Sequence, residues 1–253
     1  MIAILSPAKT IDESNFNIEL NVTTPRFLED SKIIMDQLKE LEIPELSKLM
    51  KINDNLAELN YIRNQSWKIF DGSSKKPAVL SFKGEAYRGL DAENFTTEEL
   101  EYCNDNLRIL SGLYGSLRPL DGILPYRLEM GTKLPVKDKK NLYEFWKENL
   151  TASMHRDLKN HKEKFIVNLA SEEYSKVINL KEFDVITPVF KERRGGSFKI
   201  VTVYAKKARG MMVRYMVENR VETVDELKEF TMDGYRHNEV LSKGNELVFT
   251  REE

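Results

Sequence analysis

Basic residues recur along this chain beside glycine, proline or tyrosine, at points where a strand or helix is expected to end. They are Lys9, Lys83, Arg118, Arg127, Lys206, Lys207 and Arg209. Lysine and arginine bind phosphate through charge-assisted hydrogen bonds, and a neighbouring glycine lets a ligand approach the backbone closely. We therefore expect these residues to form a phosphate-binding cleft.

Ser6, Lys9 and Glu129 are the candidates for catalysis in that cleft. Ser6-Pro7-Ala8-Lys9 matches S-x-x-K, the nucleophile pattern of some serine acyltransferases, although the sequence has no S-D-N or K-T-G partner. Ser6-Pro7 is also a helix-start signal, with serine as N-cap and proline at the first helical position. In that case Lys9 would lie one turn into the helix, near N–H groups that hold an anion. A serine nucleophile, an anion site and a purely structural strand end all stay open.

The stretch from Asn106 to Gly131 predicts a helix-hairpin-helix-like element. Thr96 and Glu99 have the spacing of a capping box, which starts a helix at about Thr97. Its apolar face would hold Leu100, Cys103, Leu107 and Leu110. The segment Gly112–Gly115, including Tyr114, would then turn sharply into a second short helix and present N–H groups to a phosphate. The alternative is an ordinary helix C-cap followed by a loop packed with leucine.

Composition bounds the class of protein. The chain has 253 residues, of which 41% are hydrophobic and 32% charged, enough to bury a core under a highly charged surface. One cysteine and three histidines are too few for a zinc or iron–sulfur site, so we expect no metal and no cofactor. The N-terminus has no signal-peptide pattern and no apolar run is long enough to span a membrane, which predicts a cytoplasmic protein.

Charge is distributed unevenly along the chain. The net charge of −2 argues against a protein that coats nucleic acid without specificity. Residues 191–214, however, hold eight basic residues and one acidic residue, whereas residues 218–253 hold five basic and ten acidic residues. This asymmetry permits a local anion site on a nearly neutral molecule.

The order of elements predicts an α/β fold of the mixed α+β kind. We expect strands over 1–5, 78–82, 165–170, 184–190, 197–204 and 246–250. Amphipathic helices are expected over 26–41 and 44–63, from Leu142, and from about Ala205 to Arg220. No linker or repeat divides the chain, so residues 1–253 should form one compact domain with a mixed central sheet, flanking helices and the helix-hairpin-helix-like element.

Eight segments of the sequence resemble the YaaA family of bacterial peroxide-stress proteins. They are SPAKT (6–10), FKGEAYRGL (82–90), LSGLYGSLRPLD (110–121), PYRLEMG (125–131), LYEFW (142–146), NLASEEY (168–174), YAKKARG (204–210) and NELVF (245–249). The resemblance spans the chain. It implies a cytoplasmic protein that limits damage by hydrogen peroxide, partly by keeping free iron low. It further implies a mixed α/β domain with a positively charged cleft, a helix-hairpin-helix-like element and affinity for DNA, but no defined reaction.

Two functions fit the residues and the resemblance together. The first is a DNA-binding protection protein, in which phosphate contacts dominate and Tyr87 or Tyr114 stacks on an unpaired base. The second is an enzyme acting on a nucleotide or a damaged nucleobase, with Ser6, Lys9 or Glu129 doing the chemistry. Direct iron sequestration is disfavoured by the shortage of histidine and cysteine. DNA is the expected partner; neither a membrane nor a stable protein partner is expected.

Overall fold

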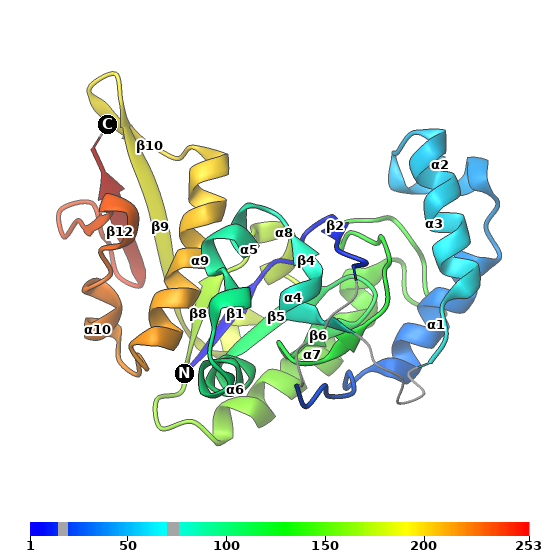
Figure 1. Ribbon diagram of the computed structural model, residues 1–253, viewed down its shortest axis with the longest axis horizontal. Coiled ribbons are helices and arrows are strands. Elements are labelled where there is room, and N and C mark those ends of the chain that lie inside the picture. Colours follow the sequence, from blue (N-terminus) through cyan, green and yellow to red (C-terminus); the bar gives the residue numbers. More distant parts are fainter. Residues whose placement is uncertain (15–19, 70–75, 253) are drawn as a thin grey trace.

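An eight-stranded mixed sheet forms the centre of the computed structural model, which describes residues 1–14, 20–69 and 76–252 (Figure 1). Its strands are β1 (Ile2–Leu5), β5 (Leu107–Ser111), β6 (Gly115–Leu117), β8 (Phe165–Leu169), β9 (Asp184–Arg194), β10 (Ser197–Lys199), β11 (Arg236–His237) and β12 (Glu246–Arg251). They run in the order β11-β12-β9-β8-β1-β5-β6, and β10 pairs with β9. The central pairs from β12 to β5 are parallel, while β6, β10 and β11 add antiparallel edges. The predicted α/β class with a mixed sheet is confirmed.

Two short ribbons lie outside this sheet. In one, β2 (Thr10–Ile11) pairs with β4 (Phe82–Lys83), and in the other β3 (Lys76–Pro77) pairs with β7 (Gly122–Ile123), both antiparallel. The first ribbon holds the segment after β1 against the segment that carries Lys83.

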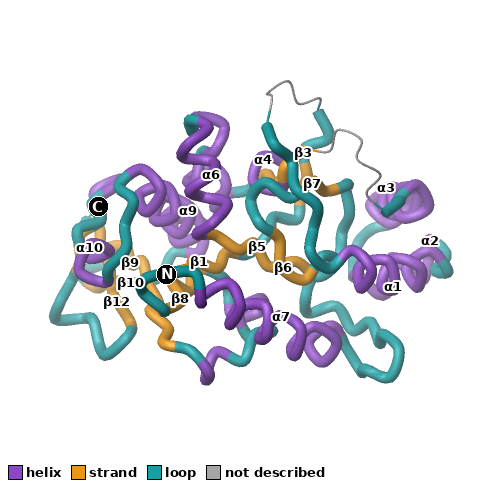
Figure 2. Tube along the Cα trace, turned by 90° about the horizontal axis from the view of Figure 1, so that it is seen from below, coloured by secondary structure: helices purple, strands orange, loops and turns teal. Residues whose placement is uncertain are grey.

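The α-helices are α1 (Leu28–Lys39), α2 (Ile43–Met50), α3 (Asp54–Ser66), α4 (Ala78–Ser81), α5 (Glu85–Leu90), α6 (Thr97–Asn106), α7 (Leu142–Lys159), α8 (Glu172–Ser175), α9 (Thr202–Glu218) and α10 (Val224–Lys228). Some of them cover the two faces of the sheet. Figure 2 shows α6 and α9 on one face and α7 on the other, while α2 and α3 form a lobe at one end of the molecule.

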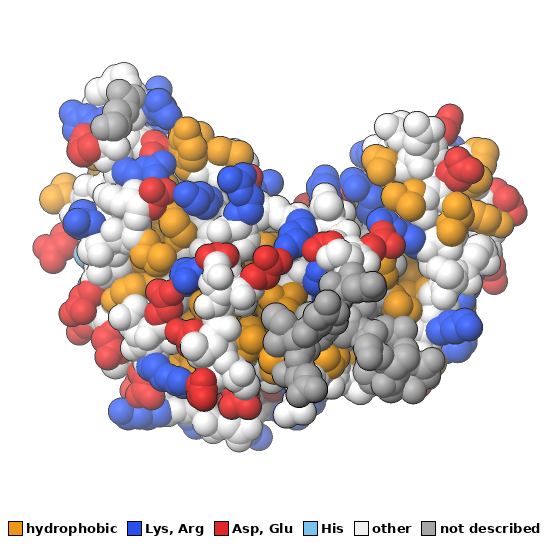
Figure 3. Space-filling model, viewed as in Figure 1, with side chains coloured by type: hydrophobic (Ala, Val, Ile, Leu, Met, Phe, Trp, Pro, Cys, Tyr) orange, Lys and Arg blue, Asp and Glu red, His pale blue; other side chains and the backbone are white. Residues whose placement is uncertain are grey.

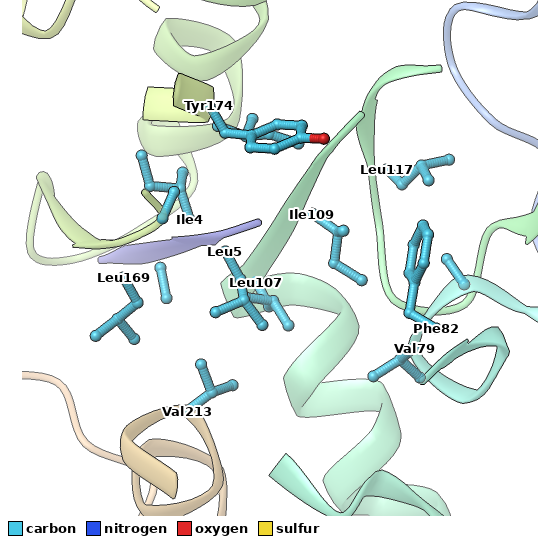
Figure 4. Close-up of a cluster of buried hydrophobic side chains, with 14 of the residues drawn as sticks. Ile4, Leu5, Val79, Phe82, Leu107, Ile109, Leu117, Leu169, Tyr174 and Val213 are labelled. Carbon is cyan, nitrogen blue, oxygen red and sulfur yellow. The ribbon is translucent and has the colours of Figure 1, made fainter. Parts of the chain in front are cut away.

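The core lies where the parallel strands meet the helices. All four residues of β1 and all five of β5 are buried, as is usual for parallel strands covered on both faces. Side chains from three parallel strands and from α9 meet there (Figure 4), among them Ile4, Leu5, Leu107, Ile109, Leu169 and Val213.

The chain changes direction across the sheet between β1 and β8. Helix α6 leads into β5 on one side of β1, and α7 then leads back on the opposite face to β8 on the other side of β1. In open α/β sheets, ligands bind at such a switch point, in the crevice outside the carboxyl ends of the strands. Ser6 and Ser171 follow these two ends.

Several sequence predictions are confirmed. Strands cover most of residues 1–5, 165–170, 184–190 and 246–250, and α6 begins with the predicted capping box of Thr96 with Glu99. Cys103 is fully buried on α6, as a small core residue.

The predicted helix-hairpin-helix-like element at residues 106–131 is wrong. Helix α6 ends at Asn106, and the leucine-rich run after it is the central strand β5, which turns through residues 112–114 into the antiparallel strand β6. Leu107 and Leu110 fit a helical repeat, but burial of all five residues of β5 requires a strand with both faces covered.

Four other local predictions differ from the structure. No helix begins at Pro7, because the chain continues directly into β2. Residues 78–81 form the buried helix α4 instead of a strand. The helix expected over 44–63 is broken at Lys51, which adopts a left-handed backbone conformation with φ 53°, and Asn53 caps the next helix. The strand expected over 197–204 ends at Lys199, since α9 starts at Thr202.

Candidate functional site

A cavity of about 350 Å³ opens at the carboxyl ends of β1 and β8. Eight of the residues singled out from the sequence line it, namely Ser6, Lys9, Lys83, Tyr87, Arg127, Glu129, Lys206 and Arg209. They come from the ends of β1 and β4, from α5, from the loop after β7, and from α9. The parallel strands and α9 therefore bring together residues that lie up to two hundred positions apart.

Ser6 ties the two strand ends together at the bottom of the cavity. Its Oγ accepts a hydrogen bond from the Ser171 backbone N–H at 2.9 Å and donates to Ser171 Oγ at 3.2 Å. Its carbonyl accepts from the Tyr87 hydroxyl at 3.0 Å. The Ser6 hydroxyl thus fixes the spacing of β1 and β8 at the switch point.

Glu129 neutralises two of the cavity's cations. Its Oε2 lies 2.8 Å from Lys9 Nζ, and its Oε1 lies 3.4 Å from an Arg127 guanidinium nitrogen. The Arg127 Nε is buried and has no hydrogen-bond partner within the described parts of the chain. Lys83 is similarly paired with Glu93, and it also lies 3.7 Å from Asp12.

Lys206 and Arg209 differ from these paired cations. They lie one turn apart on α9 and both face the cavity, and neither has an ion pair or hydrogen bond with any residue that the structure describes. Arg209 is partly buried, and this desolvation lowers the pKa of its guanidinium. Two cations on one wall that lack a counter-ion among the described residues can attract an anion.

Close packing of α9 on α5 places these two residues. An added Cβ at Gly210 would lie 1.7 Å from the Ala86 carbonyl oxygen, and one at Gly89 would lie 2.1 Å from the Lys207 carbonyl oxygen. Only glycine at both positions lets the two helix backbones approach so closely. The sequence segments YRGL and ARGM carry these two glycines, although neither glycine was predicted to serve helix packing.

The remaining predicted binding residues, Gly112, Tyr114, Gly115, Arg118 and Lys207, lie outside the cavity. Tyr114 is 2% exposed, and its hydroxyl accepts hydrogen bonds from Trp67 Nε1 at 3.0 Å and the Leu124 N–H at 3.2 Å. It has no free ring face on which a base could stack. Arg118 pairs with the buried Asp121 at 2.9 Å, and Lys207 pairs with Asp233 at 3.3 Å.

Gly112 and Gly115 serve packing. A Cβ at Gly112 would lie 2.4 Å from the Leu128 carbonyl oxygen, so the absence of a side chain lets the loop of Arg127 and Glu129 reach the cavity. Gly115 has a positive φ of 68°, and a Cβ there would lie 2.8 Å from the Trp146 ring. The glycine turn thus supports the site from behind.

Three tyrosines in the cavity wall were not assigned together from the sequence. Tyr87, Tyr126 and Tyr174 are each less than 9% exposed, and their rings form part of the lining. Burial raises the pKa of each hydroxyl, so all three are neutral near pH 7. Ser171, Glu173 and Tyr174 follow β8 as Ser6 and Lys9 follow β1, which is the signal that could have found them.

The cavity lies at the bottom of a broader hollow. Figure 3 shows this hollow between two raised lobes, with lysine and arginine side chains along it and several acidic side chains among them. A second concavity of about 700 Å³ shares Lys9, Arg127, Glu129 and Glu173 with the cavity. It adds Glu45, Lys48 and Lys51 from α2 and its end, and Lys133 from the loop after Gly131. Basic residues outnumber acidic ones in this lining, so a mainly positive surface extends from the cavity toward α2.

Within residues 1–14, 20–69 and 76–252, no three His, Cys, Asp or Glu side chains are grouped closely enough to hold a metal ion. In the same residues, no helix combines the length and the apolar character needed to cross a membrane.

Comparison with known proteins gives the family. Residues 1–241 match the family described as peroxide stress protein YaaA. The chain belongs to this family. It is also 55% identical to a UPF0246 protein of Clostridium perfringens over 254 residues, 48% identical to one of Flavobacterium johnsoniae over 257 residues, and 46% identical to one of Clostridium botulinum over 258 residues. These alignments cover 99–100% of this chain and the whole of each relative.

Every residue that lines the cavity lies within the part matched by the peroxide-stress family. The resemblance seen in eight sequence segments is confirmed by a match that covers nearly the whole chain. Five of those segments, 6–10, 82–90, 125–131, 168–174 and 204–210, supply residues that line this cavity.

Proposed function

We propose that this peroxide-stress protein binds DNA in the basic hollow, with Lys206 and Arg209 contacting backbone phosphates, and that it does so in the cytoplasm. The observation that carries this proposal is the pair of cations on α9 that face the cavity without a counter-ion among the described residues. Their neighbours Lys9, Lys83 and Arg127 are neutralised by Glu129 and Glu93. A phosphate oxygen would supply the missing partner.

The surroundings of the pair support a polyanion. Lys48, Lys51 and Lys133 line the adjoining concavity and continue the positive surface away from α9. A DNA strand lying along the hollow could place one phosphate on Arg209 and others on these lysines, and the release of counterions would favour binding. The net charge of −2 then confines binding to this face.

In this proposal the protein protects against peroxide by binding to DNA. The lower free iron that the family resemblance implies belongs to the same proposal. Cells that produce only the Lys206→Ala/Arg209→Ala variant should then show the same rise in chelatable iron after peroxide treatment as cells that lack the protein. Normal iron control in those cells would separate the iron effect from this surface.

The DNA-binding test compares two variants that remove equal charge. Lys206→Ala/Arg209→Ala removes the two cations that lack a counter-ion among the described residues, and Lys159→Ala/Lys164→Ala removes two exposed lysines near the amino end of β8, at the opposite end of the parallel strands. Fluorescence anisotropy with a labelled duplex should show DNA affinity weakened roughly tenfold or more for the first variant only. A tenfold loss corresponds to about 1.4 kcal/mol of binding free energy, which the loss of two charge-assisted phosphate contacts exceeds. Its log–log salt slope should flatten by about 1.8, because each phosphate contact contributes about 0.9. Equal affinity and slope in the two variants would place DNA elsewhere.

The alternative proposal is an enzyme acting on a nucleotide or a damaged nucleobase. It is favoured by the convergence of Ser6, Lys9 and Glu129 on one cavity, where the Lys9–Glu129 pair at 2.8 Å could pass a proton to a bound base. Mass spectrometry of oligonucleotides carrying an oxidised base, incubated with equimolar protein, tests it. A product that forms with the native protein and not with Glu129→Gln would favour the enzyme, whereas unchanged oligonucleotides would leave DNA binding as the function.

A further inference from the structure

We propose that the cavity binds a single nucleotide, with its phosphate on Lys206 and Arg209 and its base against the tyrosine-lined wall. Two sources share this chemistry: a free nucleoside monophosphate, and an unpaired nucleotide within a DNA strand. For the second source the inference rests on the proposed DNA binding; for the first it stands without it.

The phosphate end is defined by charge. Lys206 is exposed and Arg209 is partly buried, and both line the cavity, so positive charge reaches from the open hollow into the cavity. A terminal phosphate carries up to two negative charges, which matches two neighbouring cations that have no partner in the described residues. The planar guanidinium of Arg209 can in addition donate two parallel hydrogen bonds to one phosphate group.

The base end is defined by fixed aromatic rings. The Tyr87 hydroxyl is held by the Ser6 carbonyl at 3.0 Å, and the Tyr126 hydroxyl lies 2.6 Å from Ser111 Oγ. Because these hydroxyls are engaged, the rings are held in place and present carbon surface to the cavity, together with Leu5 and Leu169. A rigid aromatic and aliphatic wall suits a planar base better than a sugar.

Size and polar groups narrow the ligand further. About 350 Å³ lies within the range of small-ligand sites, so the cavity can take one nucleotide but not a base-paired duplex. The Ser171 hydroxyl and the Glu129 carboxylate also line it and can bond to the edge of a base. Inorganic phosphate would occupy only the cationic end.

Calorimetric titration with defined probes tests the inference on the whole chain. The probes are the four deoxynucleoside 5′-monophosphates, the matching nucleosides, ribose 5-phosphate and inorganic phosphate. At least one monophosphate should bind tenfold or more tightly than its nucleoside, ribose 5-phosphate and inorganic phosphate. If no monophosphate binds, or if ribose 5-phosphate binds equally well, the inference is wrong.

Two variants locate the bound nucleotide. Arg209→Gln should weaken monophosphate binding at least tenfold and nucleoside binding less than twofold, whereas Arg156→Gln, an exposed arginine on α7, should change neither. Ala8→Leu adds bulk to the cavity lining without removing charge, and should also weaken monophosphate binding at least tenfold. Thermal melting checks that each variant is folded. Full binding by folded Arg209→Gln and Ala8→Leu would contradict the site.

A DNA arm separates the two sources. If the ligand is part of a strand, a duplex with one unpaired nucleotide should bind at least tenfold more tightly than the perfect duplex, and Ala8→Leu should abolish that preference. If free monophosphates bind but this preference is absent, the ligand is the free nucleotide. Should a duplex bind through Lys206 and Arg209 while no monophosphate binds and an unpaired nucleotide adds nothing, this inference fails and the DNA proposal stands. If a monophosphate binds but no duplex does, the nucleotide site stands and the DNA proposal fails.

Discussion

Replacing Gly210 by alanine should destabilise the protein and displace the helix that carries Lys206 and Arg209. The new Cβ would lie 1.7 Å from the Ala86 carbonyl oxygen, whereas ordinary van der Waals contact begins at 3.4 Å. The backbones of α5 and α9 would therefore have to separate by about 1.7 Å at this point. Both contact atoms belong to backbone or Cβ, so no flexible side chain can relieve the clash.

The size of the effect follows from two opposing terms. Overpacking of this kind costs about 3 kcal/mol, while alanine in a helix interior gains up to about 1 kcal/mol over glycine. We expect a net loss of about 2 kcal/mol in the free energy of unfolding, which for a chain of this size lowers the melting temperature by about 4–8 °C. DNA affinity should fall as well, because α9 moves.

Urea unfolding of the single and double variants measures this. Gly89→Ala should be destabilising for the same reason, since its Cβ would lie 2.1 Å from the Lys207 carbonyl oxygen. The double variant should lose less than the sum of the two, because one separation of the helices relieves both clashes. A Gly210→Ala variant as stable as the native protein, or more stable, would refute the close packing of α5 and α9.

Four further predictions concern other parts of the molecule. The Asp157 carboxylate lies 2.8 Å from Arg26 and 2.7 Å from Arg108; burial opposes its charge, but these two arginines hold its pKa below the ordinary value. This stabilisation is present above the unfolded pKa of about 3.9 and is lost as the pH falls through the folded pKa. Asp157→Asn should therefore lower the free energy of unfolding by about 3 kcal/mol at pH 7 and make stability less dependent on pH in acid. Urea unfolding at several pH values measures this, and an unchanged acid profile would contradict it. Ser6→Ala should cost about 1 kcal/mol through its bonds to Ser171 and leave DNA binding weakened but present, whereas a covalent adduct of Ser6 with an acyl or phosphoryl probe would show a nucleophile. Metal analysis of the purified protein should find no stoichiometric zinc or iron, and one tightly held ion per chain would overturn this. Calorimetry should give one cooperative transition for residues 1–253, and two separate transitions would count against a single folding unit.

Local sequence patterns predict the strands that lead to the site. The apolar run of β1 and its end at Ser6-Pro7 can be recognised from neighbouring residues alone, as can β8, β9 and β12. Since parallel strands end at one edge of a sheet, the expectation that Ser6 and Lys9 lie in a cleft needed no long-range information. Lys206, Lys207 and Arg209 were predicted to lie in the same cleft, at the start of a helix. In the structure the helix α9 already begins at Thr202, so these three residues lie inside it.

The misassigned strand β5 shows where local patterns stop. Arg108 looks like an exposed position between apolar residues, which favours a helix with one buried face. In the structure Arg108 is 6% exposed and is neutralised by Asp157, 49 residues away. The sequence does not show this pairing, so the two-sided burial of the strand could not be expected.

The glycines of the turn after β5 show a second limit. Glycine permits close approach of a backbone, and the approaching group can be a phosphate or another segment of the same chain. At Gly112 it is the Leu128 carbonyl oxygen. Sequence alone does not separate these two uses, which is why Gly112, Tyr114 and Gly115 were expected at the phosphate site and lie behind it.

A crystal structure of the protein with a short DNA duplex that carries one unpaired nucleotide would show whether DNA binds at Lys206 and Arg209. DNA should lie in the hollow between the two lobes, with a phosphate oxygen about 2.7–2.9 Å from the Arg209 guanidinium, the distance of a charge-assisted hydrogen bond. Lys206 should contact the same or the next phosphate. DNA bound on another face, with no phosphate on Lys206 or Arg209, would show that this hollow is not the DNA-binding surface.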